Sequence, residues 1–381
     1  MDLSSDRRPL VAIDARLLAY RRGGIPRYVR GLIDHVPRSA IDLDFAFVVN
    51  RQAILPGVST ITVRTPPHHR WERLALGLEL SGRRPALLHS TDFVPPRTVG
   101  VRRVATVHDL DFLEHPQHLS SQAARYYGQV PRAIMDAEHV IAVSDATRCR
   151  VIDRLAVPPE RVTTIRNGVD HRFFGPFPGD PGSILATELG RAVATAILAE
   201  RPIILTVGTV EPRKRHTLLV GAVEILAAAR PASAPLLVVV GQPGWRTEDT
   251  EATIAALAGR GLAVRLPEVS DAALQALYRT ATLLALPSCD EGFGLPAVEA
   301  MASGLPVIAA ERGALPEIVA DAGLLVSADD ADAWSATLAE LLDDATGRAK
   351  LAARGRARAE LFRWERTAER TAAVYRQVLA G

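Results

Sequence analysis

Two glutamates flank a Gly-Phe-Gly turn in the sequence DEGFGLPAVEAMASG, residues 290–304. Glu291 precedes the turn, and Glu299 lies about one turn into the helix that Pro296 is expected to open. A glycine-rich turn that leads into a helix offers backbone N–H groups to an anion such as a phosphate. Carboxylates instead accept hydrogen bonds from hydroxyl groups. The plainer alternative is a tight connection in which one glutamate only faces the helix dipole.

A second turn supplies positive charge. The stretch VGTVEPRKRHTLL also leaves an expected strand and enters an expected helix, and it presents Arg213 and Lys214 together. The chain has 43 arginines and only two lysines, Lys214 and Lys350, which suggests that the turn requires a compact cation. Arg215 and His216 fit a solvated basic cluster. The spacing is not that of a Walker loop.

A third turn lies in YRRGGIPRYVRGL near the start of the chain. Gly23 and Gly24 allow a close approach of the backbone to a ligand, and Pro26 is expected to open the next helix. A Gly-Gly pair can equally be the end of a loop. The dinucleotide fingerprint GxGxxG does not follow the first expected strand.

A single ligand could satisfy the basic turn and both glutamates. Arg213 and Lys214 can neutralise a diphosphate, and each carboxylate can accept two hydrogen bonds from a vicinal diol. A molecule with a diphosphate between two diols matches this pattern. A nucleotide sugar has this form, because it carries a ribose at one end and a hexose at the other.

The chain resembles a retaining glycosyltransferase of family 4, with the GT-B fold, over nearly its whole length. The motifs that carry the resemblance are GGIPRY, TVHDL, VSDATR, IRNGVD, GTVEPRK, VSDAALQALY, PSCDEGFGLPAVEAMASG, GALPEIV and FRWERTAERTAAVYR. EPRK together with the two-glutamate motif is specific, whereas any single piece is not.

The resemblance implies a role for each site residue. Glu299 would bind the ribose, and Glu291 would hold the transferred sugar. Arg213 and Lys214 would bind the departing diphosphate, and His108 would lie near the anomeric carbon. The alternative for His108 is a strand-end histidine bonded to backbone. The remaining donor-binding residues implied are Gly23, Gly24, Gly292, Phe293, Gly294 and Leu295.

The resemblance also implies the reaction. A hexose would move from a nucleotide-diphosphate sugar to an acceptor hydroxyl with retention of configuration, without a metal or another cofactor. The motifs GTVEPRK and EGFGLP are similar to those of bacterial polysaccharide mannosyltransferases. GDP-mannose is therefore the first donor to expect, and UDP-sugars follow. The two Asp-x-Asp strings, Asp42 with Asp44 and Asp109 with Asp111, are not expected to bind a metal.

The elements that must position these residues repeat along the chain. Apolar strand-like runs such as LVAIDA and PIILTVG precede helix-like patterns such as IPRYVRGLIDHV and HTLLVGAVEILAAA. Strands that are apolar on both faces and separated by helices are typical of parallel sheets covered on both sides. Two such series predict two doubly wound, Rossmann-like α/β domains, joined in the Pro- and Gly-rich segment 173–183.

The predicted N-terminal domain covers residues 1–174 and the C-terminal domain covers 184–361. The resemblance implies that the first binds the acceptor and the second the nucleotide sugar, with a cleft between them. It also implies that a last helix, 362–381, crosses back onto the N-terminal domain.

Composition and charge limit the cellular location and the partners to be expected. No apolar run reaches the roughly 18 residues of a membrane span, and no h-region of a signal peptide is visible at the start, which favours a cytoplasmic protein. Residues 1–170 hold 24 arginines against 18 acidic residues, a net charge of +6, and the remainder carries 21 basic against 25 acidic residues, a net charge of −4. The basic half is either a solvated face or a peripheral contact with an anionic membrane or acceptor, for which the helical stretch 68–84 is a candidate. Nucleic acid is not an expected partner, because basic and aromatic residues do not alternate.

Three other functions compete. A Rossmann dehydrogenase lacks support because its fingerprint is missing. A GT-B phosphorylase would need a pyridoxal lysine, for which only Lys214 and Lys350 exist, and a sugar-nucleotide epimerase is a related alternative. A non-catalytic nucleotide-sugar binding module would keep the same charged residues and show binding without turnover.

Overall fold

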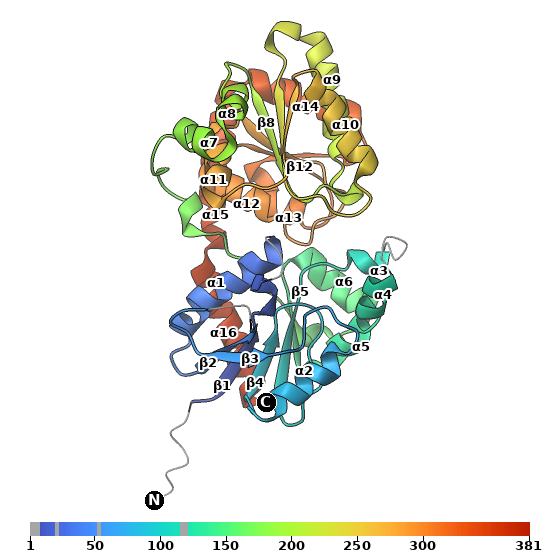
Figure 1. The fold of residues 1–381 in the computed structure, drawn as a ribbon, viewed down its shortest axis with the longest axis vertical. Helices are drawn as coiled ribbons and strands as arrows, with labels where there is room; N and C mark the ends of the chain where they lie inside the picture. Colours follow the sequence, from blue (N-terminus) through green and yellow to red (C-terminus); the bar gives the residue numbers. More distant parts are fainter. Residues whose placement is uncertain (1–7, 20–22, 52–54, 115–120) are drawn as a thin grey trace, which may run out of the picture. The chain divides into compact units, whose positions relative to one another are not determined.

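The computed structural model describes residues 8–19, 23–51, 55–114 and 121–381, which fold as two compact α/β units (Figure 1). The N-terminal unit comprises the described residues up to Gly168 together with Arg363–Gly381, and the C-terminal unit comprises Val169–Phe362. Each unit contains one wholly parallel sheet. The predicted fold of two doubly wound domains is therefore confirmed. The expectation that the chain starts without a signal peptide concerns its first residues, and residues 1–7 lie outside the described residues.

Seven strands form the N-terminal sheet, in the order β3-β2-β1-β4-β5-β6-β7. Their bounds are β1 Leu10–Asp14, β2 Asp44–Asn50, β3 Thr60–Val63, β4 Leu87–Ser90, β5 Arg102–Val107, β6 His139–Ala142 and β7 Val162–Thr164. The helices of this unit are α1 Gly24–Ser39, α2 Glu72–Ser81, α3 Asp111–Glu114, α4 Ser121–Tyr127, α5 Val130–Met135, α6 Asp145–Leu155 and α16 Trp364–Ala380.

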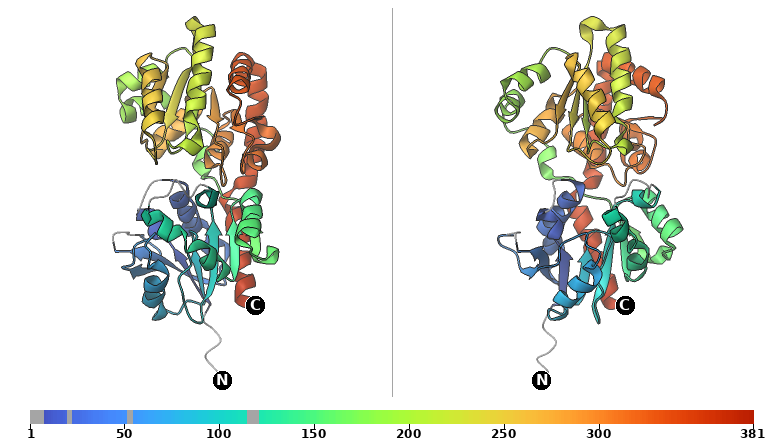
Figure 2. Two further views of the ribbon diagram at one scale, coloured as in Figure 1. Left: turned by 90° about the vertical axis from the view of Figure 1, so that its right-hand side faces the viewer. Right: turned by 45° about the vertical axis from the view of Figure 1, so that its right-hand side comes forward.

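Both faces of this sheet are buried. In β1, Val11 and Ile13 pack in one apolar cluster with α1 and α16, whereas Ala12 packs with α2 on the other face. Alternate residues of a strand point to opposite faces, so a strand covered on both sides must be apolar at every position. This explains why the strand segments are continuous apolar runs. Figure 2 shows the helices on either side of each sheet.

Trp364 anchors α16 to the N-terminal unit. Its indole occupies space that two glycines leave open: a Cβ on Gly31 of α1 would lie 2.2 Å from the ring, and a Cβ on Gly168 would lie 2.4 Å from it. Further along α16, the hydroxyl of Thr367 donates to the carbonyl of Arg166 at 2.8 Å. The predicted return of the last helix to the N-terminal domain is confirmed (Figure 1).

A buried histidine connects α16 to the centre of the sheet. His89 of β4 lies 2.5 Å through Nδ1 from the hydroxyl of Tyr375 and 2.8 Å through Nε2 from the hydroxyl of Thr106. Burial, together with the charge of nearby His108, lowers the pKa of His89 to about 3, so the ring is neutral at physiological pH. Both of its ring nitrogens therefore form structural hydrogen bonds.

Six strands form the C-terminal sheet, in the order β10-β9-β8-β11-β12-β13. Their bounds are β8 Ile203–Val207, β9 Leu236–Val240, β10 Ala263–Leu266, β11 Leu283–Leu286, β12 Val307–Ala310 and β13 Leu324–Val326. The helices are α7 Pro181–Leu189, α8 Arg191–Ile197, α9 His216–Ala229, α10 Glu248–Gly259, α11 Asp271–Thr280, α12 Leu295–Ser303, α13 Leu315–Val319, α14 Ala331–Asp343 and α15 Ala345–Ala359.

Each sheet contains one point at which the strand order reverses. In the N-terminal sheet β1 pairs with β4, and in the C-terminal sheet β8 pairs with β11. The connections that leave these neighbouring strands run in opposite directions along the sheet, and open α/β sheets bind ligands at such points, beyond the carboxyl ends of the strands. The topology thus marks one candidate ligand edge in each unit.

The boundary between the units lies before the segment in which the sequence predicted it. Residues 169–183 belong to the C-terminal unit, so that unit begins at Val169 rather than after residue 174. Three contacts within the C-terminal unit explain the difference. The ring of Phe173 lies edge-on to Tyr278, and Arg279 donates to the carbonyls of Phe173 and Gly175. The Pro- and Gly-rich composition marks an irregular segment, but these contacts hold it on one unit.

The packing of Trp364 against Gly31 can be tested by adding one methyl group. Gly31→Ala should lower the free energy of unfolding of the N-terminal unit by roughly 1–3 kcal/mol, because the new Cβ overlaps the indole. Gly221→Ala is the matched control in α9, where no atom lies within 4 Å of the added Cβ. It should raise stability by roughly 0.5–1 kcal/mol through better helix propensity. Urea unfolding followed by tryptophan fluorescence measures both, and an equal effect of the two substitutions would contradict the packing of Trp364 on α1.

Candidate functional site

The two glycine-bearing turns of the C-terminal unit meet at its strand-order reversal. The basic turn follows β8 and the two-glutamate loop follows β11, and these strands are paired. Two hydrogen bonds join the two turns: the N–H of Cys289 donates to the carbonyl of Arg213 at 2.9 Å, and the side-chain Nη1 of Arg213 donates to the carbonyl of Asp290 at 2.8 Å. The structure therefore brings together the residues that the sequence predicted for the diphosphate and for the sugar.

Lys214 and Glu291 form the centre of this site. Nζ of Lys214 lies 2.5 Å from Oε1 of Glu291, and the hydroxyl of Ser288 donates to the same oxygen at 2.8 Å. Nη1 of Arg213 lies 3.8 Å from the other carboxylate oxygen. Burial by itself raises the pKa of Glu291, but the charges of Lys214 and Arg213 outweigh it and lower the pKa overall. Glu291 is thus held ionised although it is buried.

The backbone around Glu291 is fixed by a neighbouring turn. Gly313 follows β12 with φ of 57°, and a Cβ at this position would lie 2.7 Å from the backbone N and O of Glu291. The N–H of Ala314 donates to the carbonyl of Glu291 at 2.9 Å. The sequence contained this turn in the motif GALPEIV, but its part in holding the loop was not predicted.

Helix α12 begins as the sequence predicted. Gly294 adopts the left-handed conformation, with φ of 96°, at the N-cap, and Pro296 lies in the first turn. Glu299 is one turn in and buried, and the hydroxyl of Tyr278 on α11 donates to its Oε2 at 3.0 Å. The ring of Phe293 packs edge-on against Phe362, so Phe293 has only its backbone to offer a ligand. Tyr278 and Ser288 are site residues that sequence reasoning missed, because a lone tyrosine or serine carries no spacing signal.

The other basic residues of the turn point to different partners. Arg213 also donates to Oε1 of Glu211 at 2.9 Å, and Arg215 pairs with Asp329. His216 is buried rather than solvated, as the first residue of α9. Burial, reinforced by the charge of Lys214, lowers the pKa of His216 to about 4. The expectation of a solvated cluster is wrong for His216, because its side chain is buried.

The N-terminal unit holds the remaining predicted residues at its own carboxyl edge. His108 directly follows β5, and its Nε2 lies 2.8 Å from the carbonyl of Thr91. Its ring is 5.0 Å from that of Tyr28, centroid to centroid, in a T-shaped contact. Gly23 precedes α1 with extended backbone, and Gly24 is the first residue of that helix. The sequence left open that His108 is a strand-end histidine bonded to backbone, and its contact with the carbonyl of Thr91 fits that alternative. This contact uses Nε2 and leaves Nδ1 for other contacts.

The Asp-x-Asp strings have structural settings. Asp42 pairs with Arg376 of α16 at 2.6 Å, and Asp44 opens β2. Asp109 lies between β5 and α3, Asp111 is the first residue of α3, and the N–H of Asp111 donates to Oδ1 of Asp109 at 3.3 Å. Across the described ranges, no group of three or more His, Cys, Asp or Glu residues could hold a metal ion. Metal independence stays a prediction.

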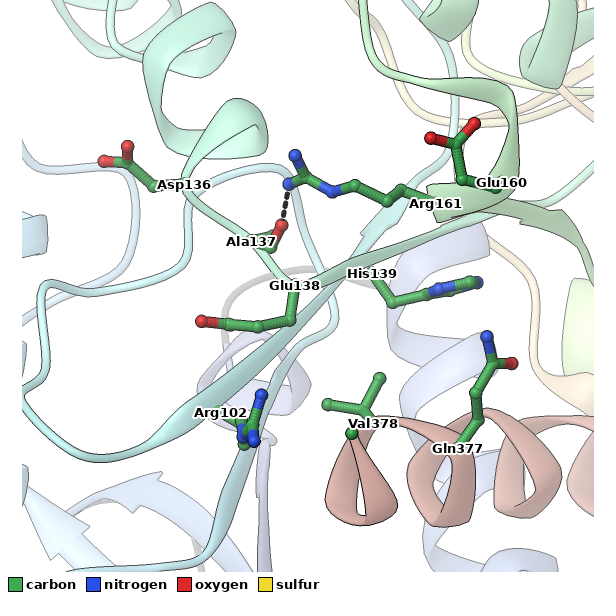
Figure 3. A pocket seen from close by; sticks show the side chains of 10 residues that line it. Arg102, Asp136, Ala137, Glu138, His139, Glu160, Arg161, Gln377 and Val378 are labelled. Atoms are coloured by element: carbon green, nitrogen blue, oxygen red, sulfur yellow. Dashed lines mark hydrogen bonds between the residues drawn. The ribbon is translucent and has the colours of Figure 1, made fainter.

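A hollow in the N-terminal unit lies at the other edge of the sheet. It is lined by residues that precede or begin β5, β6 and β7 and by the end of α16, among them Arg102, Glu138, His139, Arg161 and Gln377 (Figure 3). Arg161 donates to the carbonyl of Ala137, as drawn in Figure 3. His108 and the strand-order reversal are at the opposite, carboxyl edge. This hollow is therefore separate from the candidate site.

Two family descriptions match the chain. Residues 193–358 match "Glycosyl transferases group 1", and residues 22–173 match "Glycosyltransferase Family 4". The D-inositol 3-phosphate glycosyltransferase of Kineococcus radiotolerans is 35% identical over 273 residues, which cover 68% of this chain and 61% of that protein. The O-antigen chain mannosyltransferase B of Escherichia coli is 31% identical over 291 residues, which cover 76% of this chain and 74% of that protein. The chain spans about 60% of the length of the inositol-phosphate relatives.

Solved structures agree on the fold. Anabaena Alr3699/HepE, in complex with UDP and glucose, has a TM-score of 0.75 at 18% identity, covering 97% of this chain and 100% of that one. At this identity the likeness concerns the fold, which is of the GT-B class.

The ion pair at the centre of the site predicts a pH-dependent stability difference. Lys214→Met should destabilise the C-terminal unit by about 3–5 kcal/mol near pH 7, because it leaves the buried Glu291 without its nearest cation. In the parent the lowered pKa of Glu291 stabilises the fold above the ordinary carboxyl pKa, and this contribution is lost as the pH falls. Without Lys214, the effect of burial on the pKa of Glu291 prevails, and Glu291 can take up a proton. The difference in unfolding free energy between variant and parent should therefore shrink toward pH 4.

Thermal and urea unfolding at several pH values measure this difference. Lys350→Met replaces the other lysine, which is exposed on α15, and serves as the control. The double variant Lys214→Met/Glu291→Gln should recover part of the loss. A loss that is the same at pH 4 and pH 7 would contradict the assigned pairing.

Proposed function

The chain belongs to the family 4 glycosyltransferases of the GT-B class, and we propose that it moves a hexose from a nucleotide-diphosphate sugar to an acceptor hydroxyl. The transfer proceeds with retention and without a metal ion. Curated relatives named for glycoside and O-antigen synthesis support a place in bacterial polysaccharide, glycolipid or glycoside synthesis.

The observation that carries the proposal is the contact between the basic turn and the two-glutamate loop. Lys214 is 2.5 Å from Glu291, and both are at the strand-order reversal of the C-terminal sheet. A diphosphate needs cations, and the sugar that it carries needs hydrogen-bond acceptors within a few ångströms of them. This edge offers both on rigid strand ends.

The chemistry follows from where charge develops. When the bond between the anomeric carbon and the phosphate oxygen breaks, negative charge grows on the diphosphate. Preorganised donors stabilise such charge most effectively. Lys214 has three N–H donors and commits one to Glu291, so it can hold Glu291 and a phosphate oxygen together. Arg213 and the N–H groups of residues 292–295 add to the same potential.

The two glutamates divide the donor between them. Glu299 lies one turn into α12 and binds the ribose, and its bond from Tyr278 leaves it acceptor capacity for a diol. Glu291 holds hydroxyls of the transferred hexose. His108, Gly23 and Gly24 act from the N-terminal, acceptor-binding domain: His108 near the anomeric carbon, and the glycines against phosphate or acceptor.

The donor remains a choice among nucleotide sugars. GDP-mannose comes first because of the sequence likeness to mannosyltransferases, and the O-antigen chain mannosyltransferase B among the relatives supports it. UDP-sugars come next, supported by the UDP and glucose bound to Alr3699/HepE. The runner-up function is a nucleotide-sugar binding module or another GT-B enzyme, a phosphorylase or an epimerase.

A panel of nucleotide sugars tests the proposal. GDP-mannose, UDP-glucose and other UDP-sugars should be compared by thermal shift and by release of the nucleoside diphosphate, with and without EDTA. One donor should stabilise the protein and be turned over equally in both conditions. Loss of turnover in EDTA with recovery in manganese would instead assign a metal role to an Asp-x-Asp pair, and tight binding without turnover with any acceptor would favour the binding module.

Two isosteric substitutions separate the roles of the glutamates. Glu299→Gln should weaken the free nucleoside diphosphate and the intact donor alike, by roughly 1.5–3 kcal/mol, because it removes charge-assisted bonds to the ribose. Glu291→Gln should not weaken the free nucleoside diphosphate but should lower donor turnover. Calorimetry with both ligands, alongside kinetics, gives the comparison. Equal weakening of the bare nucleotide by both variants would rule out this division.

We propose that the enzyme is cytoplasmic and has a peripheral contact with the inner face of the membrane; a solvated basic face is the alternative. No helix of the described residues could cross a membrane. Trp71, Leu74 and Leu78 are exposed in one stripe along α2, by 55%, 45% and 76%, whereas Leu76 and Leu80 are core residues. Exposed leucines beside arginines suit an anionic interface.

Vesicle sedimentation tests this location. The protein should sediment with anionic vesicles and not with neutral ones, and Leu74→Asp/Leu78→Asp should abolish the difference. Ile225→Asp, at an exposed apolar position of α9, is the control. Equal sedimentation with both kinds of vesicle would remove the support for a membrane contact.

A further inference from the structure

Tyr28 of α1 packs over the carboxyl end of β5, where its hydroxyl and its ring contact different residues. Thr106 is the last residue but one of β5, and His108 directly follows the strand. Side chains two positions apart in an extended chain point to the same side of a sheet, so one tyrosine can reach both. The hydroxyl of Tyr28 lies 2.9 Å from Oγ1 of Thr106, and its ring lies 5.0 Å from that of His108, centroid to centroid.

The ring of His108 is held by two contacts. Its Nε2 lies 2.8 Å from the carbonyl of Thr91, and a carbonyl only accepts hydrogen bonds, so Nε2 carries a proton. The ring of Tyr28 packs against the imidazole at an interplanar angle of 81°. Without this ring beside it, the imidazole would be free to turn away from Thr91. The position of Tyr28 therefore decides the orientation of His108.

A chain of hydrogen bonds fixes the hydroxyl of Tyr28. Oγ1 of Thr106 lies 2.8 Å from Nε2 of His89 in β4, and Nδ1 of His89 lies 2.5 Å from the hydroxyl of Tyr375 in α16. All four side chains are at most 1% exposed. We call Tyr375, His89, Thr106 and Tyr28 the α16–α1 relay. It joins the last helix of the chain to the first through two strands of the sheet.

Helix α16 also holds the ring of Tyr28. The indole of Trp364 lies 6.1 Å from this ring, centroid to centroid, and occupies the space that Gly31 and Gly168 leave open. One residue of α16 thus packs against the ring of Tyr28, and another restrains its hydroxyl through the relay. Both restraints act on the side chain that contacts His108.

The relay carries no charge at physiological pH. Burial raises the pKa of Tyr28 and the pKa of Tyr375, so both hydroxyls keep their protons. Burial also lowers the pKa of His89 to about 3, so its ring is neutral. A buried network whose members are neutral and hydrogen-bonded avoids the cost of a desolvated charge and makes the local structure rigid. These properties suit a group that holds its neighbour in place.

Building on the proposed transfer function, we propose that Tyr28 is a positioning residue for His108, and that Tyr375, His89 and Thr106 act on His108 through Tyr28. Helix α16 then contributes to turnover as well as to stability. A misplacement of about 1 Å at a reacting centre can lower a rate by about 10²-fold, so a side chain that contacts no substrate can still affect the chemical step.

Two substitutions on α16 give a matched comparison. Tyr375→Phe removes a hydroxyl of the relay. Thr371→Val removes a hydroxyl one turn earlier, which donates to the carbonyl of Thr367 within the same helix. Both parent side chains are 0% exposed, so each variant loses one buried hydroxyl from α16. Thr106→Val and Tyr28→Phe interrupt the relay further along, and Tyr28→Leu removes the ring beside His108.

Kinetics are measured with whichever nucleotide sugar the protein turns over. Tyr375→Phe, Thr106→Val and Tyr28→Phe should each lower kcat about three- to ten-fold, as the loss of one buried hydrogen bond does, and Tyr28→Leu should lower it further. Thr371→Val should leave kcat as in the parent. Because Tyr375 acts through Tyr28, the double variant Tyr28→Phe/Tyr375→Phe should lower kcat little more than Tyr28→Phe alone. Calorimetry should give an unchanged affinity for the free nucleoside diphosphate, since Lys214 belongs to the other unit.

Histidine NMR reports on the imidazole without any substrate. The full chain is labelled with ¹⁵N-histidine, and the signals of His108 are assigned with His108→Gln. In the parent and in Thr371→Val, Nε2 should carry the proton. Tyr28→Leu should show a mixture of both tautomers, and Tyr28→Phe should shift the signals in the same direction. Urea unfolding shows that each variant is folded at the temperature of measurement.

Two results would overturn the proposal: a tautomer of His108 that stays as in the parent when Tyr28 is Leu, or an equal loss of kcat in Tyr375→Phe and Thr371→Val. Failure of the proposed function looks different. In that case the parent would turn over no nucleotide sugar, while the NMR signals of His108 would still decide whether Tyr28 holds its ring.

Discussion

The contact between Lys214 and Glu291 depends on the strand order of the C-terminal sheet. Parallel pairing of β8 with β11 places two turns that are far apart in sequence at one edge, and the ion pair then neutralises a carboxylate that burial alone would protonate. The interaction serves fold and chemistry together. It keeps Glu291 ionised, and under the proposed function it would hold Lys214 at the point where a leaving diphosphate gathers charge. If β8 and β11 were separated by another strand, about 4.8 Å would be added between the turns and neither role would survive.

Glycines allow these turns to approach one another. Gly313 can press against Glu291 because it has no Cβ, and its left-handed backbone is one that other residues rarely adopt. Gly294 uses the same freedom to begin α12 directly beneath the loop. In the N-terminal unit, Gly31 and Gly168 instead make room for the indole of Trp364. The conformational freedom of glycine thus shapes the site. In the N-terminal unit, the absence of a side chain instead makes room for the last helix to pack.

Much of this arrangement can be predicted from the sequence, for reasons that the structure makes clear. Continuous apolar runs separated by helical patterns can satisfy only parallel sheets covered on both faces, so the fold class follows from periodicity. Pro296, Gly294 and Gly304 mark the ends of α12 by their own backbone preferences. Partners distant in sequence leave no such mark. Tyr278 reaches Glu299 from another helix. Ser288 is close to Glu291 in sequence, but its contact depends on the conformation of the loop, which the residue types do not reveal. The unit boundary shifted for the same reason, since the contact of Phe173 with Tyr278 depends on packing and not on composition.

The two strand-order reversals have the same topology and different ion pairs. At the β8–β11 reversal Lys214 and Arg213 pair with Glu291, Arg213 pairs also with the buried Glu211, and a helix N-terminus lies beside them. At the β1–β4 reversal Arg16 pairs with Asp14 and Glu72, and His68 pairs with Asp92. The same topology thus brings different polar groups together in the two units, because the residues that follow each strand, and not the strand order, decide which charges meet there.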